Sequence, residues 1–367
     1  MRSPLQVGLE ATAACRPVRT GIARYAYNLM ANLVALGHPE GETYTAFARA
    51  SRLWKRGCRP TPVAGLKWKW YEDSLPLFAR SIQVMHGLEM RVPARFRGPR
   101  VATVHDLFGL VSDDLLNSGA RKRNAQRYQE VADSCDQVIA VSEQTKRDFL
   151  RFYDFPPERI HVVHLGVDPA FRPRSNEEVE QLRSRHRLHS PFLLYVGDLT
   201  PRKNLLCLLQ AFELCEVSRD LELVIVGARE DGAGDLDEAL RKSTRRDQVR
   251  TMGWIEEEDL QLLYSAAEAL VFPSLYEGFG LPILEALASR TPALGSMAGA
   301  LPEVAAGHAT LVDPKDPDAI AEGIVQVLRT TPRMIEAAEQ HARGFSWQSC
   351  AERTRTIYRH AVEVYQG

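Results

Sequence analysis

ALVFPSLYEGFGLPILEALASR, residues 269–290, is the stretch that decides the fold of this chain. Its apolar first part has the length of a buried strand, its turn carries two glycines, and Pro282 suits the first position of the helix that follows. The same succession of apolar run, polar turn and helical spacing recurs along the chain. It predicts an α/β fold in which parallel sheets are wound with helices.

Two series of short apolar runs have the character of strands. The first series comprises residues 6–9, 44–48, 83–86, 101–104, 137–141 and 160–163. The second series comprises residues 192–196, 222–226, 249–252, 269–272, 292–294 and 310–312. Two such series in a chain of 367 residues predict two doubly wound domains rather than one core.

A charged, proline-containing stretch over residues 168–190 separates the two series and has little strand signal. We therefore expect one Rossmann-like domain over residues 1–172 and a second over residues 173–345. Residues 346–367 have the apolar spacing of a helix, with Ser346 as its candidate N-cap. They are too far from a strand to continue the series, so this helix is expected to pack elsewhere.

The composition is that of an ordinary globular protein, with 45% apolar residues, 25% charged residues and a net charge of −1. These values argue against a disordered chain and give no indication of nucleic-acid binding. No apolar window approaches the roughly 18 to 20 residues of a membrane span, and the N-terminal stretch MRSPLQVGLEATAAC is too polar for a secretory signal. We expect a cytoplasmic protein, with peripheral contact to the inner face of the membrane left open. The six cysteines are scattered without ligand spacing and are expected to be reduced.

Chemistry is sought just after the strands, because ligands of open α/β sheets bind beyond the carboxyl ends. Glu277-Gly-Phe-Gly-Leu-Pro-Ile-Leu-Glu285 follows one expected strand. Its glycines let a ligand approach the backbone, and a carboxylate before the helix with another in its first turn can each accept two hydroxyl hydrogen bonds. The alternative is that Glu285 only complements the helix dipole and that Glu277 is a solvated loop residue.

Arg202 and Lys203 occupy a second strand-to-helix turn, Gly197-Asp-Leu-Thr-Pro-Arg-Lys-Asn204. Two cations there can neutralise a diphosphate and stabilise it as it leaves. Adjacent basic residues in a loop are more often only solvated surface, and that interpretation stays open beside the functional one.

Two further candidates belong to the first half of the chain. Gly21 opens a helix after the first strand and could bring backbone close to a phosphate or a sugar. His105 ends the strand VATV, where it can contact a sugar hydroxyl or the reacting centre. The alternative is a structural histidine with Asp106 capping the next segment. Ser142 at a similar position is better explained as an N-cap.

No metal site and no cofactor is expected. The spacings Asp235 to Asp237 and Asp316 to Asp318 lie in polar turns before helices, where N-terminal carboxylates explain them. The chain has neither the dinucleotide nor the P-loop glycine pattern. LKWKWY, residues 66–71, interleaves cations with aromatics; packing of its rings into the domain is favoured over contact with a lipid or a sugar.

The chain resembles the large retaining glycosyltransferase family 4, the glycosyl transferases group 1, over nearly its whole length. The resemblance is carried, in the family's order, by Thr20-Gly21, His105-Asp106, Ala140-Val-Ser142, Gly166-Val-Asp168, Thr200-Pro-Arg-Lys-Asn204, Met252-Gly-Trp254, the Glu277 to Glu285 spacing and Leu301-Pro-Glu303. The Glu277 to Glu285 spacing with its EGFGLP interior is the specific part. The PRKN form of the second turn and the segment Trp70-Tyr-Glu72 resemble the corresponding segments of bacterial transferases that build polysaccharides, which are often mannosyltransferases.

This resemblance implies a GT-B architecture, in which two Rossmann-like doubly wound domains face each other across a cleft. The second domain would hold the donor, the first the acceptor, and the last helix would cross back to the N-terminal domain.

The resemblance also implies roles for individual residues. His105, beside the anomeric centre, and Glu277, on the donor sugar, would be the catalytic residues. The implied donor-binding residues are Gly21, Arg202, Lys203, Gly253, Trp254, Ile255, Glu277, Gly278, Phe279, Gly280, Leu281 and Glu285. Arg202 and Lys203 would bind the diphosphate and Glu285 the ribose, while residues 252–255 would line the base.

Three positions depart from the family pattern and bear on the donor more than on the reaction type. Asp198 stands where arginine is common, Thr20 replaces the first of a glycine pair, and His164-Leu165 replaces a common Pro-Asn.

The expected function is a metal-independent, retaining hexosyltransferase with front-face transfer, acting on a saccharide or lipid-linked acceptor in bacterial polysaccharide synthesis. GDP-mannose is the favoured donor and UDP-sugars remain open. Two other classes stay as alternatives: a GT-B-like nucleotide-sugar epimerase and a non-catalytic carbohydrate-binding or assembly subunit.

Overall fold

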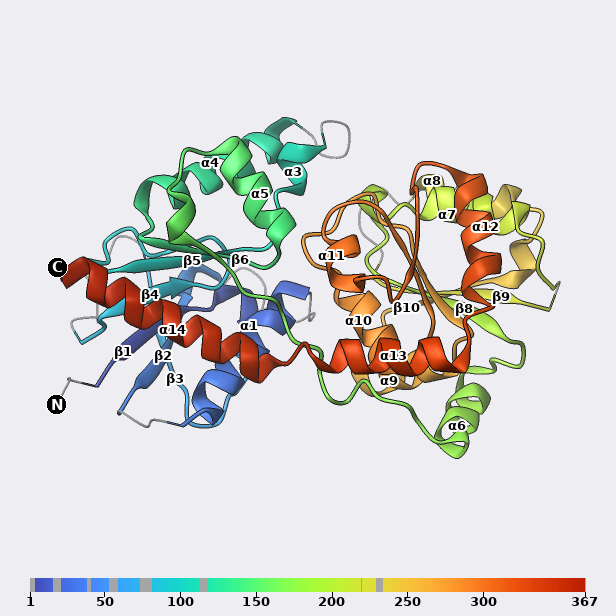
Figure 1. The fold of residues 1–367 in the computed structure, drawn as a ribbon, viewed down its shortest axis with the longest axis horizontal. Coiled ribbons are helices and arrows are strands. Elements are labelled where there is room, and N and C mark those ends of the chain that lie inside the picture. The colour runs from blue at the N-terminus through green and yellow to red at the C-terminus, as the bar shows by residue number, and fades with distance from the viewer. Residues whose placement is uncertain are drawn as a thin grey trace. The chain divides into compact units, whose positions relative to one another are not determined.

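The computed structural model of the chain describes residues 4–15, 21–37, 41–52, 59–72, 81–112, 118–218, 220–228 and 234–366. The chain divides into two compact units (Figure 1). The first unit comprises Met1–Gly166 and Ser346–Gly367, and the second comprises Val167–Phe345.

The division after Gly166 comes earlier than the boundary expected after residue 172. The amide of Val167 donates to the carbonyl of Phe345 at 3.0 Å, and the Phe171 ring packs edge-on against Tyr264. The carbonyl of Arg172 accepts a hydrogen bond from Ser265 Oγ. These contacts tie the segment after Gly166 to the second unit.

The first unit is built on a seven-stranded sheet in the order β3-β2-β1-β4-β5-β6-β7, and all neighbouring strands pair in parallel. The strands are β1 (Gln6–Glu10), β2 (Thr43–Arg49), β3 (Lys67–Tyr71), β4 (Val84–Gly87), β5 (Arg100–Val104), β6 (Gln137–Ala140) and β7 (Ile160–Val162). Six of these were expected, and all of them except β7 have buried central residues, as runs covered by helices on both faces should be.

The strand β3 was missed. Lys67 and Lys69 are exposed and alternate with the part-buried Trp68 and Trp70, which pack against Cys15 and Ala48. This alternation is the pattern of an edge strand with one covered face. The aromatic rings are therefore part of the packing of the first unit.

The second unit contains a six-stranded parallel sheet in the order β10-β9-β8-β11-β12-β13. Its strands are β8 (Phe192–Val196), β9 (Glu222–Val226), β10 (Val249–Gly253), β11 (Ala269–Phe272), β12 (Ala293–Ser296) and β13 (Thr310–Val312). All six were expected. The α/β prediction with two doubly wound parallel sheets is thus confirmed.

Helices connect the strands and cover the sheets. In the first unit they are α1 (Gly21–Ala35), α3 (Phe108–Val111), α4 (Ser118–Ser134), α5 (Glu143–Phe152) and α14 (Trp347–Gln366). In the second unit they are α6 (Asn176–His186), α7 (Leu205–Leu214), α8 (Gly234–Lys242), α9 (Glu257–Ala266), α10 (Leu281–Ala288), α11 (Leu301–Ala305), α12 (Pro317–Val327) and α13 (Pro332–Arg343). Among the described residues, none of the helices has the length and apolarity needed to span a bilayer.

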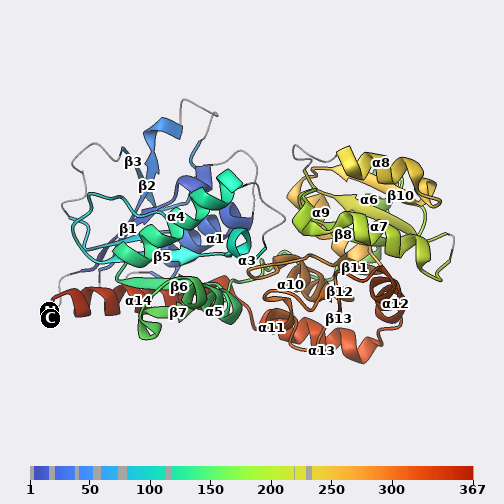
Figure 2. The ribbon, with the colours of Figure 1, turned by 90° about the horizontal axis from the view of Figure 1, so that it is seen from above.

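The expected final helix is α14. It packs along α1 and against β4, β5 and β6, so the last part of the chain completes the first unit. Figure 1 shows α4 and α5 on the opposite side of this sheet. In the second unit, α10 packs against α11 and α13, and the three helices lie together in Figure 2.

Both sheets reverse their strand order beside their first strand. In the first unit β1 lies between β2 and β4, and in the second β8 lies between β9 and β11. Connections leave such a pair of strands in opposite directions and open a crevice at the carboxyl ends, which is where doubly wound folds bind ligands. The two reversal points therefore locate the regions to search for a site.

Candidate functional site

The turn after β8 is held in place by Asn204. This residue adopts a left-handed conformation with φ of 62°, and its Nδ2 donates to the carbonyls of Pro273 at 2.9 Å and Pro314 at 2.6 Å. Asparagine tolerates this conformation better than most residues. Asn204 belongs to the expected motif, but no role was predicted for it; the available signal was an asparagine between a short turn and a helix.

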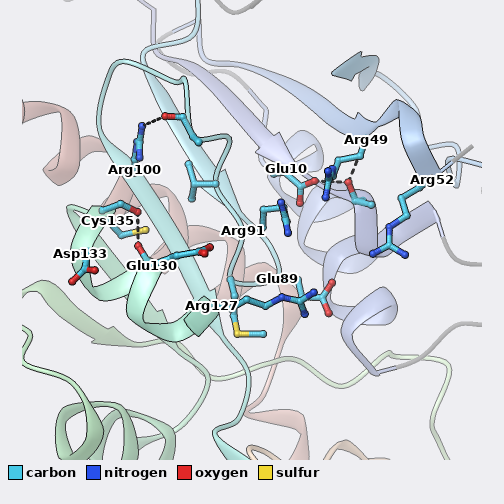
Figure 3. Close-up of a pocket in the computed structure, with 15 residues that line it drawn as sticks. Glu10, Arg49, Arg52, Glu89, Arg91, Arg100, Arg127, Glu130, Asp133 and Cys135 are labelled. Atoms are coloured by element: carbon cyan, nitrogen blue, oxygen red, sulfur yellow. Dashed lines mark hydrogen bonds between the residues drawn. The ribbon is translucent and has the colours of Figure 1, made fainter. Parts of the chain in front are cut away.

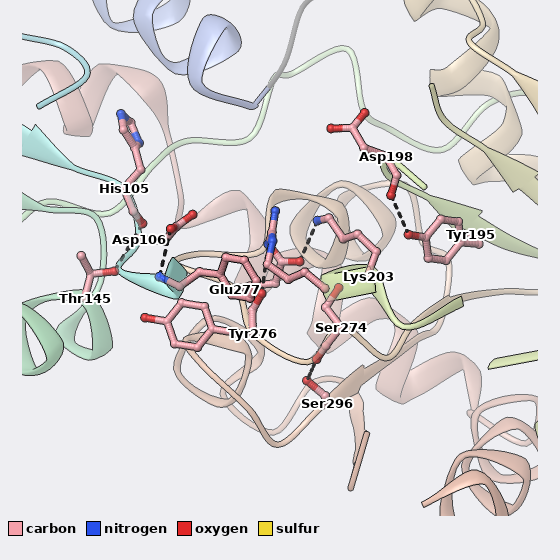
Figure 4. A network of polar contacts seen from close by, with 12 residues as sticks. His105, Asp106, Thr145, Tyr195, Asp198, Lys203, Ser274, Tyr276, Glu277 and Ser296 are labelled. Carbon is pink, nitrogen blue, oxygen red and sulfur yellow. Dashed lines mark hydrogen bonds and ion pairs between the residues drawn. The ribbon is translucent and has the colours of Figure 1, made fainter. Parts of the chain in front are cut away.

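The same turn places two cations on Glu277, which follows β11. Arg202 Nη1 lies 3.0 Å from Glu277 Oε2, and Lys203 Nζ lies 2.6 Å from Oε1 (Figure 4). Arg202 also donates to the carbonyl of Tyr276 and accepts, through its own carbonyl, from the amide of Leu275. The turns after β8 and β11 are thus joined by both backbone and side-chain bonds at the reversal point of the sheet.

The electrostatics of this cluster hold Glu277 ionised. Glu277 and Lys203 are both only 8% exposed. Burial would raise the pKa of the Glu277 carboxyl, but Arg202 and Lys203 lower it to about 2. Burial lowers the pKa of Lys203 although Glu277 opposes this, and the ammonium also lies 4.7 Å from the centre of the Phe272 ring.

The predicted first-turn position of Glu285 is wrong. α10 begins at Leu281 with Gly280 as its N-cap, and its first turn contains no acidic residue. Glu285 is buried and accepts a hydrogen bond from the Tyr264 hydroxyl at 2.7 Å. The carboxylates of Glu277 and Glu285 therefore have different partners: two cations for Glu277 and a tyrosine hydroxyl for Glu285.

Close packing within the second unit requires glycine at position 280. Its φ is 109°, and a Cβ built there would lie 2.3 Å from Leu301 Cδ2. Gly278 and Phe279 are also buried, and the Phe279 ring packs against Phe345. Leu281 is the half-buried first residue of α10.

The predicted base-binding segment begins where β10 ends. Gly253 has a φ of 68°, and its carbonyl accepts from the amide of Gly227 at 2.9 Å. Trp254, which follows, is 55% exposed, and Ile255 is half-buried. A large exposed aromatic ring at the carboxyl end of a strand is suited to stacking on a planar group.

In the first unit, His105 is fixed by its neighbours. Its Nε2 lies 2.8 Å from the carbonyl of Leu88, and its ring meets Tyr25 edge-on at 4.7 Å between centroids. Burial lowers the pKa of His105, so the ring is neutral at neutral pH. Because a carbonyl only accepts, Nε2 carries the proton and Nδ1 is left as an acceptor. Asp106 accepts from the amide of Phe108, although the N-cap of α3 is Leu107 and not Asp106 (Figure 4).

Gly21 is the exposed first residue of α1, and a Cβ built there would meet no heavy atom within 4 Å. Thr20, its partner in the expected motif, lies outside the described residues. Asp316 is the N-cap of α12, while Asp235 and Asp237 lie in the first turn of α8, as expected.

A buried polar chain behind His105 was not found from the sequence. His86 bonds Tyr358 through Nδ1 at 2.6 Å and Thr103 through Nε2 at 2.8 Å, and Thr103 also bonds the Tyr25 hydroxyl at 2.8 Å. Burial lowers the pKa of His86 to about 3. The chain runs from α14 through β4 and β5 to α1, and nothing in local spacing marks its members as partners.

The chain matches two family models. Residues 177–343 match the model described as Glycosyl transferases group 1, and residues 79–171 match the model described as Glycosyltransferase Family 4. The first range lies in the second unit, and the second range covers the later part of the first unit.

Curated proteins and a solved structure are also similar. The O-antigen chain mannosyltransferase B of Escherichia coli is 32% identical over 75% of this chain and 74% of that protein. The MMP alpha-(1->4)-mannosyltransferase of Mycolicibacterium hassiacum is 35% identical over 73% of this chain and 67% of that protein. The sucrose-phosphate synthase of Thermosynechococcus elongatus superposes with a TM-score of 0.78 at 20% identity, covering 98% of this chain and 100% of that one.

Proposed function

This chain belongs to glycosyltransferase family 4, with its GT-B fold, and on that premise we propose that it is a retaining hexosyltransferase. It moves a hexose, with mannose favoured, from a nucleotide diphosphate sugar to a saccharide or lipid-linked acceptor in bacterial polysaccharide synthesis. The names of the two mannosyltransferase relatives support mannose and hence GDP-mannose as donor. The proposal includes the cytoplasmic location expected from the sequence.

The observation that carries this proposal is the bridge that Glu277 makes between Arg202 and Lys203 at the reversal point of the second sheet. A guanidinium has five donors and an ammonium three, so both cations can bond Glu277 and a phosphate oxygen at the same time. Glu277 holds the cations in place before a donor binds. Such preorganisation costs nothing at the moment of reaction.

The proposed transfer step needs no added base to remove the acceptor's proton. The bond between the anomeric carbon and the β-phosphate oxygen breaks, and a bond to the acceptor oxygen forms on the same face of the sugar. The acceptor's hydroxyl proton passes to the leaving diphosphate. Arg202 and Lys203 stabilise the charge that develops on the diphosphate, which is the task that a metal ion has in other transferases. Neutral His105 accepts a hydrogen bond from a sugar hydroxyl through Nδ1.

The test is transfer from GDP-mannose and, separately, from UDP-glucose, followed as release of the nucleoside diphosphate. Arg202→Ala and Lys203→Ala should each reduce turnover by roughly 100-fold or more. Lys242→Ala is a matched control, because this lysine is exposed on α8 and pairs with Glu238. Far-UV circular dichroism confirms that each variant is folded.

Three results would overturn the proposal. Undiminished turnover by the Arg202 and Lys203 variants would remove the role of the cations, and abolition of turnover by a chelator would contradict metal independence. Formation of an epimer from the donor alone would favour the epimerase. Proton coupling constants of the product report whether the anomeric configuration is retained.

A further inference from the structure

One ring nitrogen of His105 is held by the turn that follows β4. His105 Nε2 lies 2.8 Å from the carbonyl oxygen of Leu88, and the amide of Leu88 donates to the carbonyl of Glu10 at 3.1 Å, which extends the pairing of β1 with β4. A Cβ built at Gly87 would lie 2.0 Å from the carbonyl oxygen of Arg91, so only glycine allows this turn to fold back so closely. The backbone therefore fixes one end of the imidazole ring.

The same turn forms one wall of a pocket of about 360 Å³ (Figure 3). Among the described residues, five arginines and four carboxylates line this pocket, which reaches from the carboxyl ends of β1 and β4 to the amino ends of β5 and β6. One of the carboxylates, Glu10, is bonded by the hydroxyls of Thr12 and Tyr71, and burial raises its pKa to about 7. Charges so nearly balanced do not select one class of ligand.

The ring of His105 is held by Tyr25, which belongs to α1. The ring centroids are 4.7 Å apart and the planes meet at 79°, which is an edge-to-face contact. Tyr25 is only 1% exposed, so its ring shields the imidazole from water. Burial is the largest cause of the lowered pKa of His105, with the Leu88 carbonyl, Glu89 and Asp106 opposing it. Tyr25 therefore limits the rotation of the imidazole and helps to keep it neutral.

Two residues of α14 hold Tyr25 in turn. The Tyr25 hydroxyl bonds Thr103 Oγ1, which also bonds His86 Nε2, and both distances are 2.8 Å. His86 Nδ1 then bonds the hydroxyl of Tyr358, on α14, at 2.6 Å. Trp347, the first residue of α14, packs beside the Tyr25 ring, with 6.2 Å between the centroids. The helix thus reaches Tyr25 at its hydroxyl and at its ring.

The hydrogen-bonded chain favours a single arrangement. His86, Thr103 and Tyr358 are fully buried, and burial lowers the pKa of His86 to about 3, so its ring is neutral. A neutral imidazole donates from one nitrogen and accepts at the other, so His86 needs both of its hydroxyl partners. Loss of either partner leaves a buried polar atom unpaired, which destabilises the chain. The position of Tyr358 therefore constrains Tyr25 across β4 and β5.

We propose that Tyr25 is a positioning residue for His105 and that α14 holds Tyr25 through Tyr358 and Trp347. Tyr25 acts only through His105: it keeps Nδ1 turned toward the sugar hydroxyl that the proposed function gives to this histidine. The last helix of the chain is then required for turnover and does more than complete the first unit. The inference rests on the proposed function for the sugar, whereas the hold on the His105 ring does not.

The first test follows the His105 ring without any substrate. Histidine labelled with ¹³C at Cε1 is incorporated into the full chain, and the His105 signal is identified among the ten histidines as the one that His105→Gln removes. Tyr358→Phe should shift this signal, because the ring current of a displaced Tyr25 changes at His105. Tyr25→Leu should also raise the pKa of His105 toward its ordinary value of 6.5, because water then reaches the ring.

The second test separates turnover from nucleotide binding. With the donor that the chain turns over, Tyr358→Phe and Tyr25→Leu should each lower kcat by about tenfold or more, since a small misplacement of a group at the reacting sugar is costly. The dissociation constant of GDP, which lacks the sugar, should be unchanged. Tyr153→Phe is the matched control, because it removes the bond from another buried tyrosine hydroxyl of the first unit, to the carbonyl of Ala125. This control should change neither kcat nor the His105 signal.

The positioning role fails separately from the proposed function. It is overturned if the His105 signal is unchanged in both Tyr358→Phe and Tyr25→Leu, or moves equally in Tyr153→Phe. An unchanged kcat in both variants, or an equal fall in the control, also contradicts it. A shifted His105 signal in a chain that transfers no sugar would sustain the hold on the ring and sink the transferase. If circular dichroism shows that Tyr25→Leu does not fold, Tyr358→Phe decides, since it removes only one hydroxyl.

Discussion

Lys203 Nζ lies 2.6 Å from Glu277 Oε1 although the two residues are 74 positions apart in the chain. Both follow parallel strands that are neighbours in the second sheet, β8 and β11, so their turns meet at the same edge. Parallel pairing therefore converts two separate turns into one cluster.

Glu277→Gln should separate nucleotide binding from transfer. The variant leaves the buried Lys203 and the part-buried Arg202 without their counter-charge, which is expected to lower the free energy of unfolding by about 3 kcal/mol. Binding of GDP should be kept or strengthened, because a diphosphate supplies the missing negative charge, while transfer should fall by at least about 100-fold. Chemical denaturation, calorimetry and turnover test the three effects. Glu238→Gln, at an exposed position on α8, should change none of them.

Glu10→Gln should change how stability depends on pH. The folded state holds the proton of Glu10 up to about pH 7, whereas the ordinary value is 4.5. Between these values the folded state binds more protons than the unfolded state, so the contribution of Glu10 to stability is present at low pH and is lost as the pH rises. The difference in free energy of unfolding between Glu10→Gln and the wild type should therefore shift in favour of the variant by on the order of 2–3 kcal/mol between pH 5 and pH 8. A pH-independent difference in urea unfolding would contradict this assignment.

Thr103→Val should break the buried chain behind His105. Valine matches the shape of threonine but offers no hydroxyl to His86 Nε2 or to Tyr25, and each buried group left unpaired costs about 1–3 kcal/mol. Thr103→Ser keeps the hydroxyl and should cost only about 1 kcal/mol for the lost methyl group. Equal unfolding midpoints for the two variants would show that the chain adds nothing to stability.

Asn204→Ala and Asn204→Gly should differ from each other. Both remove the bonds to the carbonyls of Pro273 and Pro314, but glycine tolerates the φ of 62° and alanine does not. The Asn204→Ala variant is therefore expected to be about 1 kcal/mol less stable than the Asn204→Gly variant, and both variants should be less stable than the wild type. If alanine proved the more stable of the two, the left-handed conformation would not be a constraint.

The strands of the second sheet were predictable because parallel strands covered on both faces are continuous apolar runs. FLLYV, ELVIV and ALVF coincide with β8, β9 and β11. β3 escaped prediction because an edge strand alternates exposed lysines with tryptophans, and the same pattern suits a surface segment. The domain boundary was displaced because the proline-containing stretch after Gly166 has no strand signal but still packs on the second unit.

The candidate site was predictable as a set of turns but not as a set of contacts. Arg202, Lys203 and Glu277 were chosen because each follows a strand run, and this much depends on near neighbours in the chain. The pairing of both cations with Glu277 was not predicted. A diphosphate was expected as their partner, and no carboxylate of the protein was expected to bind them. The position of Glu285 was wrong because α10 begins at Leu281, one residue before the expected start at Pro282, and this places Glu285 beyond the first turn.

By itself, the sequence determined the described strands other than the edge strand β3, and which side chains follow those strands, because these depend on apolar periodicity and local backbone preferences. Tertiary structure alone decided the order of strands, the pairing of Lys203 with Glu277, the chain from Tyr358 to Tyr25, and the pocket beside Glu10. The physical reason is that each of these joins residues from separate crossovers, and only the closing of the parallel sheets brings them within bonding distance.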